Sequence, residues 1–288
     1  MLRIDPFDVY SVVTGSIRLD GGAMFGIVPK VLWDKVTDVD GHNRILLATR
    51  TLLAVDREHR RVVLADTGCG TKWSADLADR WGVQFDPQAI PKALRAIGLS
   101  ANDVTDVVIT HLHFDHAGGM TYWFDEPGGP ARLHYPQARH WVHRAQWEYA
   151  QNPHPRDRAS YLPEDFVELG RHDVIELVEG DGSQSRLNGV EWFISNGHTP
   201  GQLLPVFGTG SKRLVFACDL VPTVAHLRLA WVMAYDLAPL GTMSEKEILL
   251  RRCIDESWFL AFPHDPQTAG VAIDGPVERP IVKRTVAL

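Results

Sequence analysis

A short hydrophobic segment that leads directly into a cluster of histidines constrains this chain more than any other feature of its sequence. Residues 104–110 are apolar enough to form a buried strand, and His111, His113, Asp115 and His116 follow at once. Side chains two apart in an extended segment point the same way, so His111 and His113 can bind one ion together. If the chain then turns into a helix, Asp115 and His116 face a different direction and can hold a second ion.

The chemistry of these side chains indicates which ions they would bind. Imidazole and carboxylate are ligands of zinc, with iron, manganese or cobalt as alternatives, and paired ions in hydrolases lie about 3.5–4 Å apart. Two ions need more ligands than the cluster offers. Three candidates stand at strand ends or in loops, namely His198, Asp219 and His264.

Each of these assignments has a plainer alternative. The cluster could be a surface histidine tract, although the apolar strand before it and the two glycines after it argue against that. His198 alone could be a turn histidine, and Asp219 alone could cap a turn or helix. Asp265 could serve in place of its neighbour His264. The presence of the cluster favours the metal-binding role for all three candidates.

The order of the predicted elements indicates a layered α/β protein. Strands are predicted at 45–55, 61–66, 174–178, 190–195, 203–207 and 213–219, and helices at 74–81 and 88–97. A late helix is predicted to begin at Ser244, which has capping-box spacing to Glu247. The aromatic-rich segment near 120–173 is expected to be an irregular insertion. This order favours a single domain over residues 1–288, built from two similar halves.

Composition excludes several classes of function. The chain has 29 Lys and Arg against 36 Asp and Glu, a net charge of -7, which disfavours a nucleic-acid partner. No stretch approaches the roughly 18 apolar residues of a membrane helix, so no membrane partner is expected. The three cysteines have neither paired nor zinc-type spacing, which fits a cytoplasmic protein.

Seven of the candidate residues are similar, in type and order, to the ligand signature of the metallo-β-lactamase superfamily: His111, His113, Asp115, His116, His198, Asp219 and His264. The resemblance spans residues 66–264. It implies a four-layer αββα sandwich, two zinc ions held by all seven side chains, and a homodimer. It also implies that Asp66 orients the site from behind the ligands, with a simple turn aspartate as the alternative.

Two further segments, 20–30 and 219–236, resemble the branch of this superfamily that contains N-acyl homoserine lactonases, which quench quorum sensing, and more distantly organophosphate hydrolases. In that branch a loop like the one at Met24 and Phe25 overhangs the metal site. The resemblance therefore implies a substrate pocket lined by these two residues, with a buried hydrophobic turn as the alternative.

The chain departs from the lactonase pattern at one position. Some lactonases carry a tyrosine three residues after the bridging aspartate, where it bonds to the substrate, and this chain has Pro222 there. His226 or Tyr235 could supply the missing hydrogen bond, or either could have an ordinary structural role.

The resemblance implies that an acyl lactone is opened by a hydroxide that bridges the two ions. Asp219 would bridge both ions, and Asp115 would pass a proton to the leaving oxygen unless it is a ligand only. A phosphotriesterase or arylesterase, or a thioesterase of the glyoxalase II type, is an alternative on the same fold. A signal-binding protein with little turnover is the alternative from another class.

Overall fold

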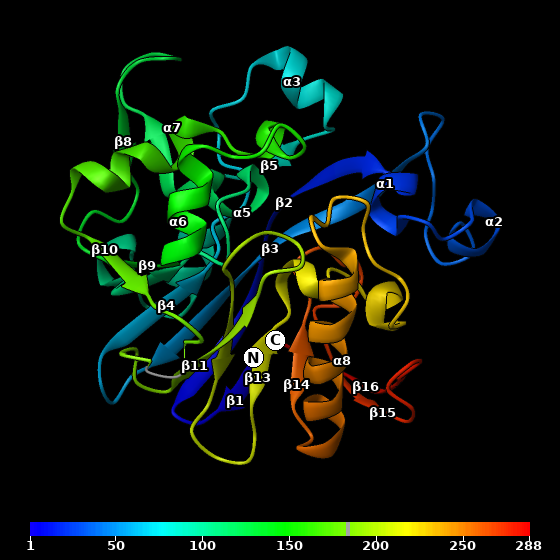
Figure 1. The fold of residues 1–288 in the computed structure, drawn as a ribbon. Helices are drawn as coiled ribbons and strands as arrows, with labels where there is room; N and C mark the ends of the chain where they lie inside the picture. Colours follow the sequence, from blue (N-terminus) through cyan, green and yellow to red (C-terminus); the bar gives the residue numbers. More distant parts are fainter. Residues whose placement is uncertain (183–184) are drawn as a thin grey trace.

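Two β-sheets packed face to face form the centre of the molecule in the computed structural model, which describes residues 1–182 and 185–288 (Figure 1). The first sheet has the order β1 (Leu2–Ile4), β2 (Phe7–Asp20), β3 (Arg44–Asp56), β4 (Arg61–Ala65), β6 (Asp106–Val108), β9 (Arg139–His143) and β10 (Ile175–Val178), with β5 (Gln84–Phe85) on β2. The second has the order β11 (Val190–Ser195), β12 (Gln202–Phe207), β13 (Leu214–Phe216), β14 (Phe259–Ala261), β15 (Gly270–Asp274) and β16 (Ile281–Val286). A separate hairpin pairs β7 (Thr121–Trp123) with β8 (Ala131–Leu133).

Helices cover the outer faces of both sheets. The α-helices are α1 (Gly21–Phe25), α2 (Lys30–Trp33), α3 (Ala75–Arg80), α4 (Ala89–Ala96), α5 (Phe114–Ala117), α6 (Arg144–Gln151), α7 (Pro163–Phe166) and α8 (Pro239–Asp255). The 3-10 helices are η1 (Ala101–Asp103), η2 (Gly118–Met120), η3 (Arg158–Ser160), η4 (Val167–Arg171), η5 (Cys218–Leu220) and η6 (Val224–Leu227). Helices α4 and α6 pack on the first sheet and α8 on the second, while α7 packs on the β7–β8 hairpin and η2.

Strand β3 shows why the sheets are buried on both faces. Leu52 and Ala54 point into the core between the sheets, while Leu53 and Val55 point into the core beneath the helices of the first sheet. Successive strand residues face opposite ways, so an uninterrupted apolar run is what a sheet covered on both sides requires. This arrangement confirms the four-layer αββα sandwich.

The structure corrects the predicted start of the late helix. Helix α8 begins at Pro239, not at Ser244. Proline suits the first helical position because its missing N–H needs no partner there. The Ser244 hydroxyl lies inside the helix and donates to the Leu240 carbonyl, so it caps nothing.

The structure also differs from the prediction within residues 120–173. This segment supplies β9, which lies between β6 and β10 in the first sheet, as well as α6 and α7. His140 and His143 make β9 look polar in the sequence, yet both side chains are buried. Only part of the aromatic-rich segment therefore lies outside the sheet.

The candidate site lies where several strands of both sheets end. The His111 to His116 cluster follows β6 of the first sheet, and His198, Asp219 and His264 follow β11, β13 and β14 of the second. Among the residues that the structure describes, no helix is both long enough and apolar enough to cross a membrane.

Candidate metal centre

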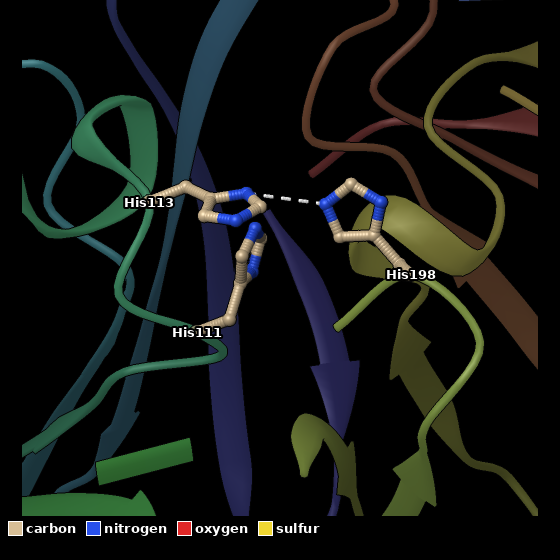
Figure 2. A group of neighbouring side chains, drawn as sticks. All are labelled: His111, His113 and His198. Atoms are coloured by element: carbon tan, nitrogen blue, oxygen red, sulfur yellow. Dashed lines mark hydrogen bonds between the residues drawn. The ribbon is translucent and has the colours of Figure 1, made fainter. Parts of the chain in front are cut away.

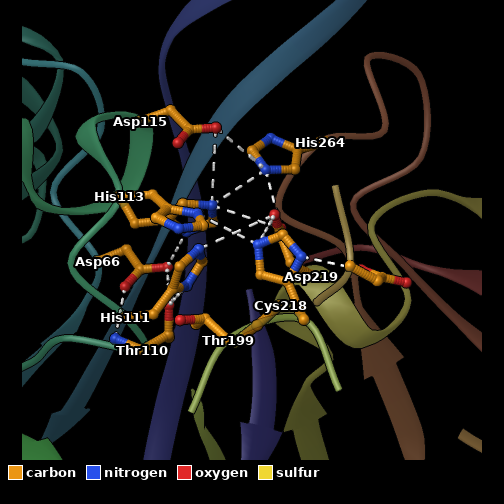
Figure 3. A network of polar contacts seen from close by, with 12 residues as sticks. Asp66, Thr110, His111, His113, Asp115, Thr199, Cys218, Asp219 and His264 are labelled. Atoms are coloured by element: carbon orange, nitrogen blue, oxygen red, sulfur yellow. Dashed lines mark hydrogen bonds and ion pairs between the residues drawn. The ribbon is translucent and has the colours of Figure 1, made fainter. Parts of the chain in front are cut away.

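All seven side chains with the predicted ligand chemistry converge at the junction of the two sheets (Figure 3). Their candidate ligand atoms form overlapping groups in which every atom lies within 4.8 Å of the others. The local structure follows the expected pattern, because the chain is extended through His113 and then turns into α5, which carries Asp115 and His116.

The first ligand group consists of His111, His113 and His198 (Figure 2). The Nδ1 atom of His113 and the Nε2 atom of His198 are 3.2 Å apart. Two nitrogens bound at about 2.0–2.1 Å to one tetrahedral zinc ion would be about 3.3 Å apart, so this spacing fits a shared ion. The buried Nε2 atom of His111 has no hydrogen-bond partner within the described chain, as expected for an atom reserved for a cation.

The second ligand group consists of Asp115, His116 and His264. The Nε2 atoms of the two histidines are 3.1 Å apart, and Oδ2 of Asp115 lies 3.5 Å from Nε2 of His264 and 3.7 Å from Nε2 of His116. Two nitrogens and a carboxylate oxygen at these separations can serve as three ligand atoms of one metal ion.

Asp219 lies between the two groups and directs one oxygen toward each of them. Its Oδ2 atom is 3.3 Å from Nε2 of His198 and 3.9 Å from Nε2 of His111. Its Oδ1 atom is 3.0 Å from Nε2 of His264 and 3.4 Å from Nε2 of His116. This is the geometry of a carboxylate that can bridge two ions.

Hydrogen bonds from behind decide which ring nitrogens face the centre. Nδ1 of His116 lies 2.7 Å from Asp66, and Nδ1 of His264 lies 2.8 Å from the carbonyl oxygen of Ala48. Both partners are acceptors, so each Nδ1 donates and each ring turns its Nε2 atom inward. Two inward-facing ring nitrogens 3.1 Å apart need a cation between them, either a proton or a metal ion, so these residues fit a metal ion.

Asp66 has the orienting geometry that the resemblance implies. Its carboxylate accepts from Nδ1 of His116, from the backbone N–H of Thr110 at 2.9 Å and from the Thr110 hydroxyl at 2.9 Å. Its backbone φ of 62° lies in the left-handed region, which aspartate tolerates better than most residues. The position is therefore more than a simple turn.

The electrostatics of the centre favour a cation. Burial lowers the pKa of His111 and of His113 well below the usual histidine range, so both rings are neutral. Burial acts the same way at His116 and His198, but nearby carboxylates outweigh it and raise the pKa of both rings. Burial would raise the pKa of Asp219, yet the surrounding histidines hold it well below its usual value. The resulting negative potential is one that a metal ion would neutralise.

A cavity of about 450 Å³ opens onto this centre. Its floor contains five of the candidate ligands: His113, Asp115, His198, Asp219 and His264. Apolar walls come from Leu19, Met24, Leu47, Trp81, Phe114 and Met233, and the polar lining includes Arg156, Asp157, Ser160 and Tyr235. A largely apolar cleft lined by a smaller number of polar groups is typical of a small-molecule site.

The structure separates the four predicted pocket residues into two pairs. Met24 and Tyr235 line the cavity, whereas Phe25 and His226 do not. The ring of Phe25 stacks on that of His226 with centroids 4.9 Å apart. His226 bonds to the Met24 carbonyl through Nε2 and to the Thr223 hydroxyl through Nδ1, so both ring nitrogens are engaged within the protein. Burial also lowers the pKa of His226 to about 3. Its structural role leaves Tyr235 as the remaining candidate for the missing hydrogen bond.

Asp236 is the main site residue that the sequence did not reveal. Its Oδ1 atom lies 2.9 Å from Nδ1 of His198, so it orients that ligand as Asp66 orients His116. Asp236 ends the 219–236 segment that carries the resemblance, but it lies 38 residues from His198, and its residue type and position alone did not indicate a contact with that histidine. Arg156 and Trp81 were missed for the same reason, since only the tertiary structure brings them to the cavity.

The chain belongs to the metallo-beta-lactamase superfamily, whose sequence model matches residues 51–264. Among characterised relatives, N-acyl homoserine lactonase AttM of Rhizobium radiobacter is 30% identical over 155 residues, which cover 51% of this chain and 52% of that protein. N-acyl homoserine lactonase AiiB of Agrobacterium fabrum is 39% identical over 70 residues, 21% of this chain and 25% of that protein. The chain therefore matches about half the length of AttM and about a quarter of the length of AiiB.

Solved structures resemble the whole chain. A probable metal-dependent hydrolase from Staphylococcus aureus superposes with a TM-score of 0.87 at 28% identity, covering 99% of this chain and 100% of that one. AidC, a dizinc quorum-quenching lactonase, superposes with a TM-score of 0.77 at 18% identity, covering 99% and 97%. The likeness to AidC concerns the fold.

Proposed function

We propose that this protein is a dinuclear metal-dependent hydrolase that opens N-acyl homoserine lactones, with zinc as its metal. The observation that carries the proposal is the position of Asp219, which directs one carboxylate oxygen toward each ligand group on the floor of a largely apolar cavity. The names of the partial relatives support the substrate class.

Bound zinc ions would supply an activated water and a Lewis acid for the lactone carbonyl. The residues of the chain position that chemistry. Asp219 and the histidines would hold the metal ions at the floor of the cavity. Asp115 lines the cavity beside both histidines of the second group. This position supports a role for Asp115 in carrying a proton to the leaving oxygen. No serine or cysteine nucleophile is needed.

The shape and lining of the cavity suit an acyl lactone. The apolar side chains of Met24, Trp81 and Met233 offer a surface for the acyl chain. Tyr235 offers a phenol to a carbonyl oxygen. Burial, together with the charge of Asp20, raises the pKa of Tyr235 to about 12, so the phenol keeps its proton and can donate.

The deciding experiment combines metal analysis with a substrate panel. Purified protein with two bound zinc ions should show a higher kcat/KM for acyl homoserine lactones than for aryl esters, phosphotriesters or glutathione thioesters. A preference for phosphotriesters or thioesters would reassign the substrate class. Tight lactone binding without product would indicate a signal-binding protein. Full activity of the metal-free protein would contradict the proposal of a dinuclear metal centre.

Asp115→Asn tests the proton-transfer role. We expect kcat on a lactone to fall roughly 10²- to 10⁴-fold, the usual contribution of a general acid or base, because the amide cannot carry a proton between oxygens. Zinc content must be measured in the same samples, since Asp115 also belongs to the second ligand group. A variant that keeps both ions and wild-type kcat would contradict the role.

A further inference from the structure

Helix α8 contacts both segments that hold the ligand His198. One is the 195–198 turn, which begins at the last residue of β11 and ends at His198 itself. The other is the 226–236 loop, which ends at Asp236, the hydrogen-bond partner of His198. Two consecutive residues of α8, Glu245 and Lys246, reach these two segments separately, and the metal centre described above uses neither of them.

Glu245 holds the turn. Its carboxylate accepts from the Ser195 hydroxyl at 2.7 Å, from the backbone N–H of Asn196 at 3.0 Å and from the backbone N–H of Gly197 at 3.1 Å. Hydrogen bonds to a charged acceptor are stronger than neutral ones. Three donors from consecutive residues on one carboxylate therefore fix the backbone immediately before His198.

Lys246 holds the loop. Its ammonium donates to the carbonyl oxygens of His226 at 3.1 Å, Arg228 at 3.1 Å and Trp231 at 2.7 Å. The side chain is fully buried, with 0% of its surface exposed. Burial lowers the pKa of Lys246 to about 7, against the opposing effect of the Asp236 charge.

A buried ammonium is costly, and an apolar side chain of similar length would fill the same space without that cost. The three carbonyls that converge on Lys246 indicate what the charge contributes instead. They belong to residues spread along the loop, so one side chain fixes its path from His226 to Trp231. The loop then supplies Met233 and Tyr235 to the cavity wall before it reaches Asp236.

The two segments are also bonded to each other beside the centre. The backbone N–H of Leu237 donates to the carbonyl of His198 at 3.2 Å, and the N–H of Ala238 donates to the carbonyl of Gly197 at 2.8 Å. Together with the contact between His198 and Asp236, these bonds make the turn and the loop one unit, with α8 as its support.

We propose that Glu245 and Lys246 are positioning residues that hold the His198 and Asp236 pair in register and thereby set the metal affinity of the first ligand group. The proposal rests on the metal centre of the proposed function and not on its substrate. It predicts that a substitution at either residue loosens both segments, the 195–198 turn and the 226–236 loop.

The first test measures zinc binding to metal-free protein against a competing chelator. Lys246→Met and Glu245→Ala should each lower the affinity for one of the two zinc ions roughly 10- to 100-fold, the usual effect of losing a residue that orients a ligand. The affinity for the other ion should stay unchanged. Glu245→Gln should fall between Glu245→Ala and the wild type, because its amide oxygen can still accept. His198→Ala and His264→Ala identify which ion belongs to which ligand group.

Matched controls lie on the exposed face of the same helix. Arg251→Met and Glu247→Gln remove one charge each from a surface ion pair and should leave both zinc affinities unchanged. Equal weakening of both ions by Lys246→Met and Glu245→Ala, or no weakening by either, would overturn the proposal.

The second test needs neither metal nor lactone. In metal-free protein, hydrogen exchange should become at least several-fold faster in residues 195–198 when Lys246 is changed to Met, and in residues 226–236 when Glu245 is changed to Ala. Faster exchange confined to the segment that each residue contacts would overturn the proposal. A wild type that binds zinc but opens no lactone would reject the proposed substrate alone. If Lys246→Met does not fold, the two Glu245 variants decide the outcome.

Discussion

An outer hydrogen bond decides which ring nitrogen faces the candidate metal centre in three of the histidines, namely His116, His198 and His264. Asp66 shows how much depends on the residue that accepts such a bond. Three donors converge on its carboxylate: Nδ1 of His116 and the two groups of Thr110. Both of its oxygens are therefore used as acceptors. The sequence allowed this role only through a family resemblance, because a single aspartate in a turn looks the same whether or not it orients a ligand.

Asp66→Asn should weaken zinc binding at the second ligand group. Asparagine keeps the volume and tolerates the positive φ, but it offers one acceptor oxygen where the site needs two. We expect a loss of roughly 10- to 100-fold in the affinity of one ion, with the His198 side of the centre unchanged. Zinc titration of Asp66→Asn, compared with titration of His264→Ala, checks this. Unchanged zinc affinities in Asp66→Asn would show that Asp66 serves the fold alone.

Tyr235→Phe should lower kcat/KM for a lactone by about 10-fold, the value of one hydrogen bond to the reacting carbonyl. The removed hydroxyl belongs to a cavity-lining residue whose high pKa keeps it a donor. Steady-state kinetics across acyl lactones provide the measurement. His226→Ala should instead lower the melting temperature, because His226 packs on Phe25 away from the cavity lining. Wild-type kinetics in Tyr235→Phe would show that Tyr235 does not replace the tyrosine that some lactonases carry at the position of Pro222.

At the scale of elements, a buried ion pair ties α7 to the turn that follows the histidine cluster. Lys72 donates to the carbonyls of Gly118 and Thr121 and lies 3.0 Å from Asp165 in α7. Burial raises the pKa of Asp165 to about 6, even though Lys72 acts to lower it. The folded state therefore holds this proton over a pH range in which the unfolded chain releases it.

This raised pKa predicts a pH dependence of stability. Below about pH 4 Asp165 is protonated in both states, and between about pH 4 and pH 6 only the folded state keeps the proton. Stability from this group is thus lost as the pH rises through that window, by about 3 kcal/mol. Asp165→Asn removes this group. Urea unfolding of metal-free protein from pH 4 to pH 7 should show the free energy of unfolding of the wild type falling relative to the variant, and parallel profiles would contradict the assignment.

The elements themselves were predictable to different degrees. The hairpin of β3 and β4 and the helix α4 have clear local signals, and the structure has them close to the predicted bounds. Strand β9 was missed because its histidines gain their burial only from the sheet around them. The start of α8 was misplaced because Ser244 and Glu247 satisfy a capping pattern that Pro239 makes unnecessary. Local signals fail where tertiary contacts decide the outcome.

At the scale of the whole molecule, the candidate ligands were predictable because chemistry and strand ends coincide. His198, Asp219 and His264 each follow a strand of the second sheet, and the cluster follows β6 of the first. Their partners were not predictable, since Asp236 and Lys246 act through contacts between segments far apart in the chain. Whether residues 1–288 form one independent domain, and whether the protein is a homodimer, stay predictions.

The metal centre joins the two halves of the sandwich, so metal binding should stabilise the whole fold. Without metal ions, ring nitrogens of buried histidines face one another at the ends of both sheets, beside the buried carboxylate of Asp219. Ions that bind only the folded state add about 4 kcal/mol at a thousandfold excess over Kd, which for a chain of this size raises the melting temperature on the order of 10 °C. Calorimetry of metal-free protein with and without zinc measures this shift. The double variant with His198→Ala and His264→Ala should lose most of it, because each half of the centre then lacks a ligand. Equal melting temperatures for wild-type protein with and without zinc would mean that the seven side chains do not act together as a metal centre.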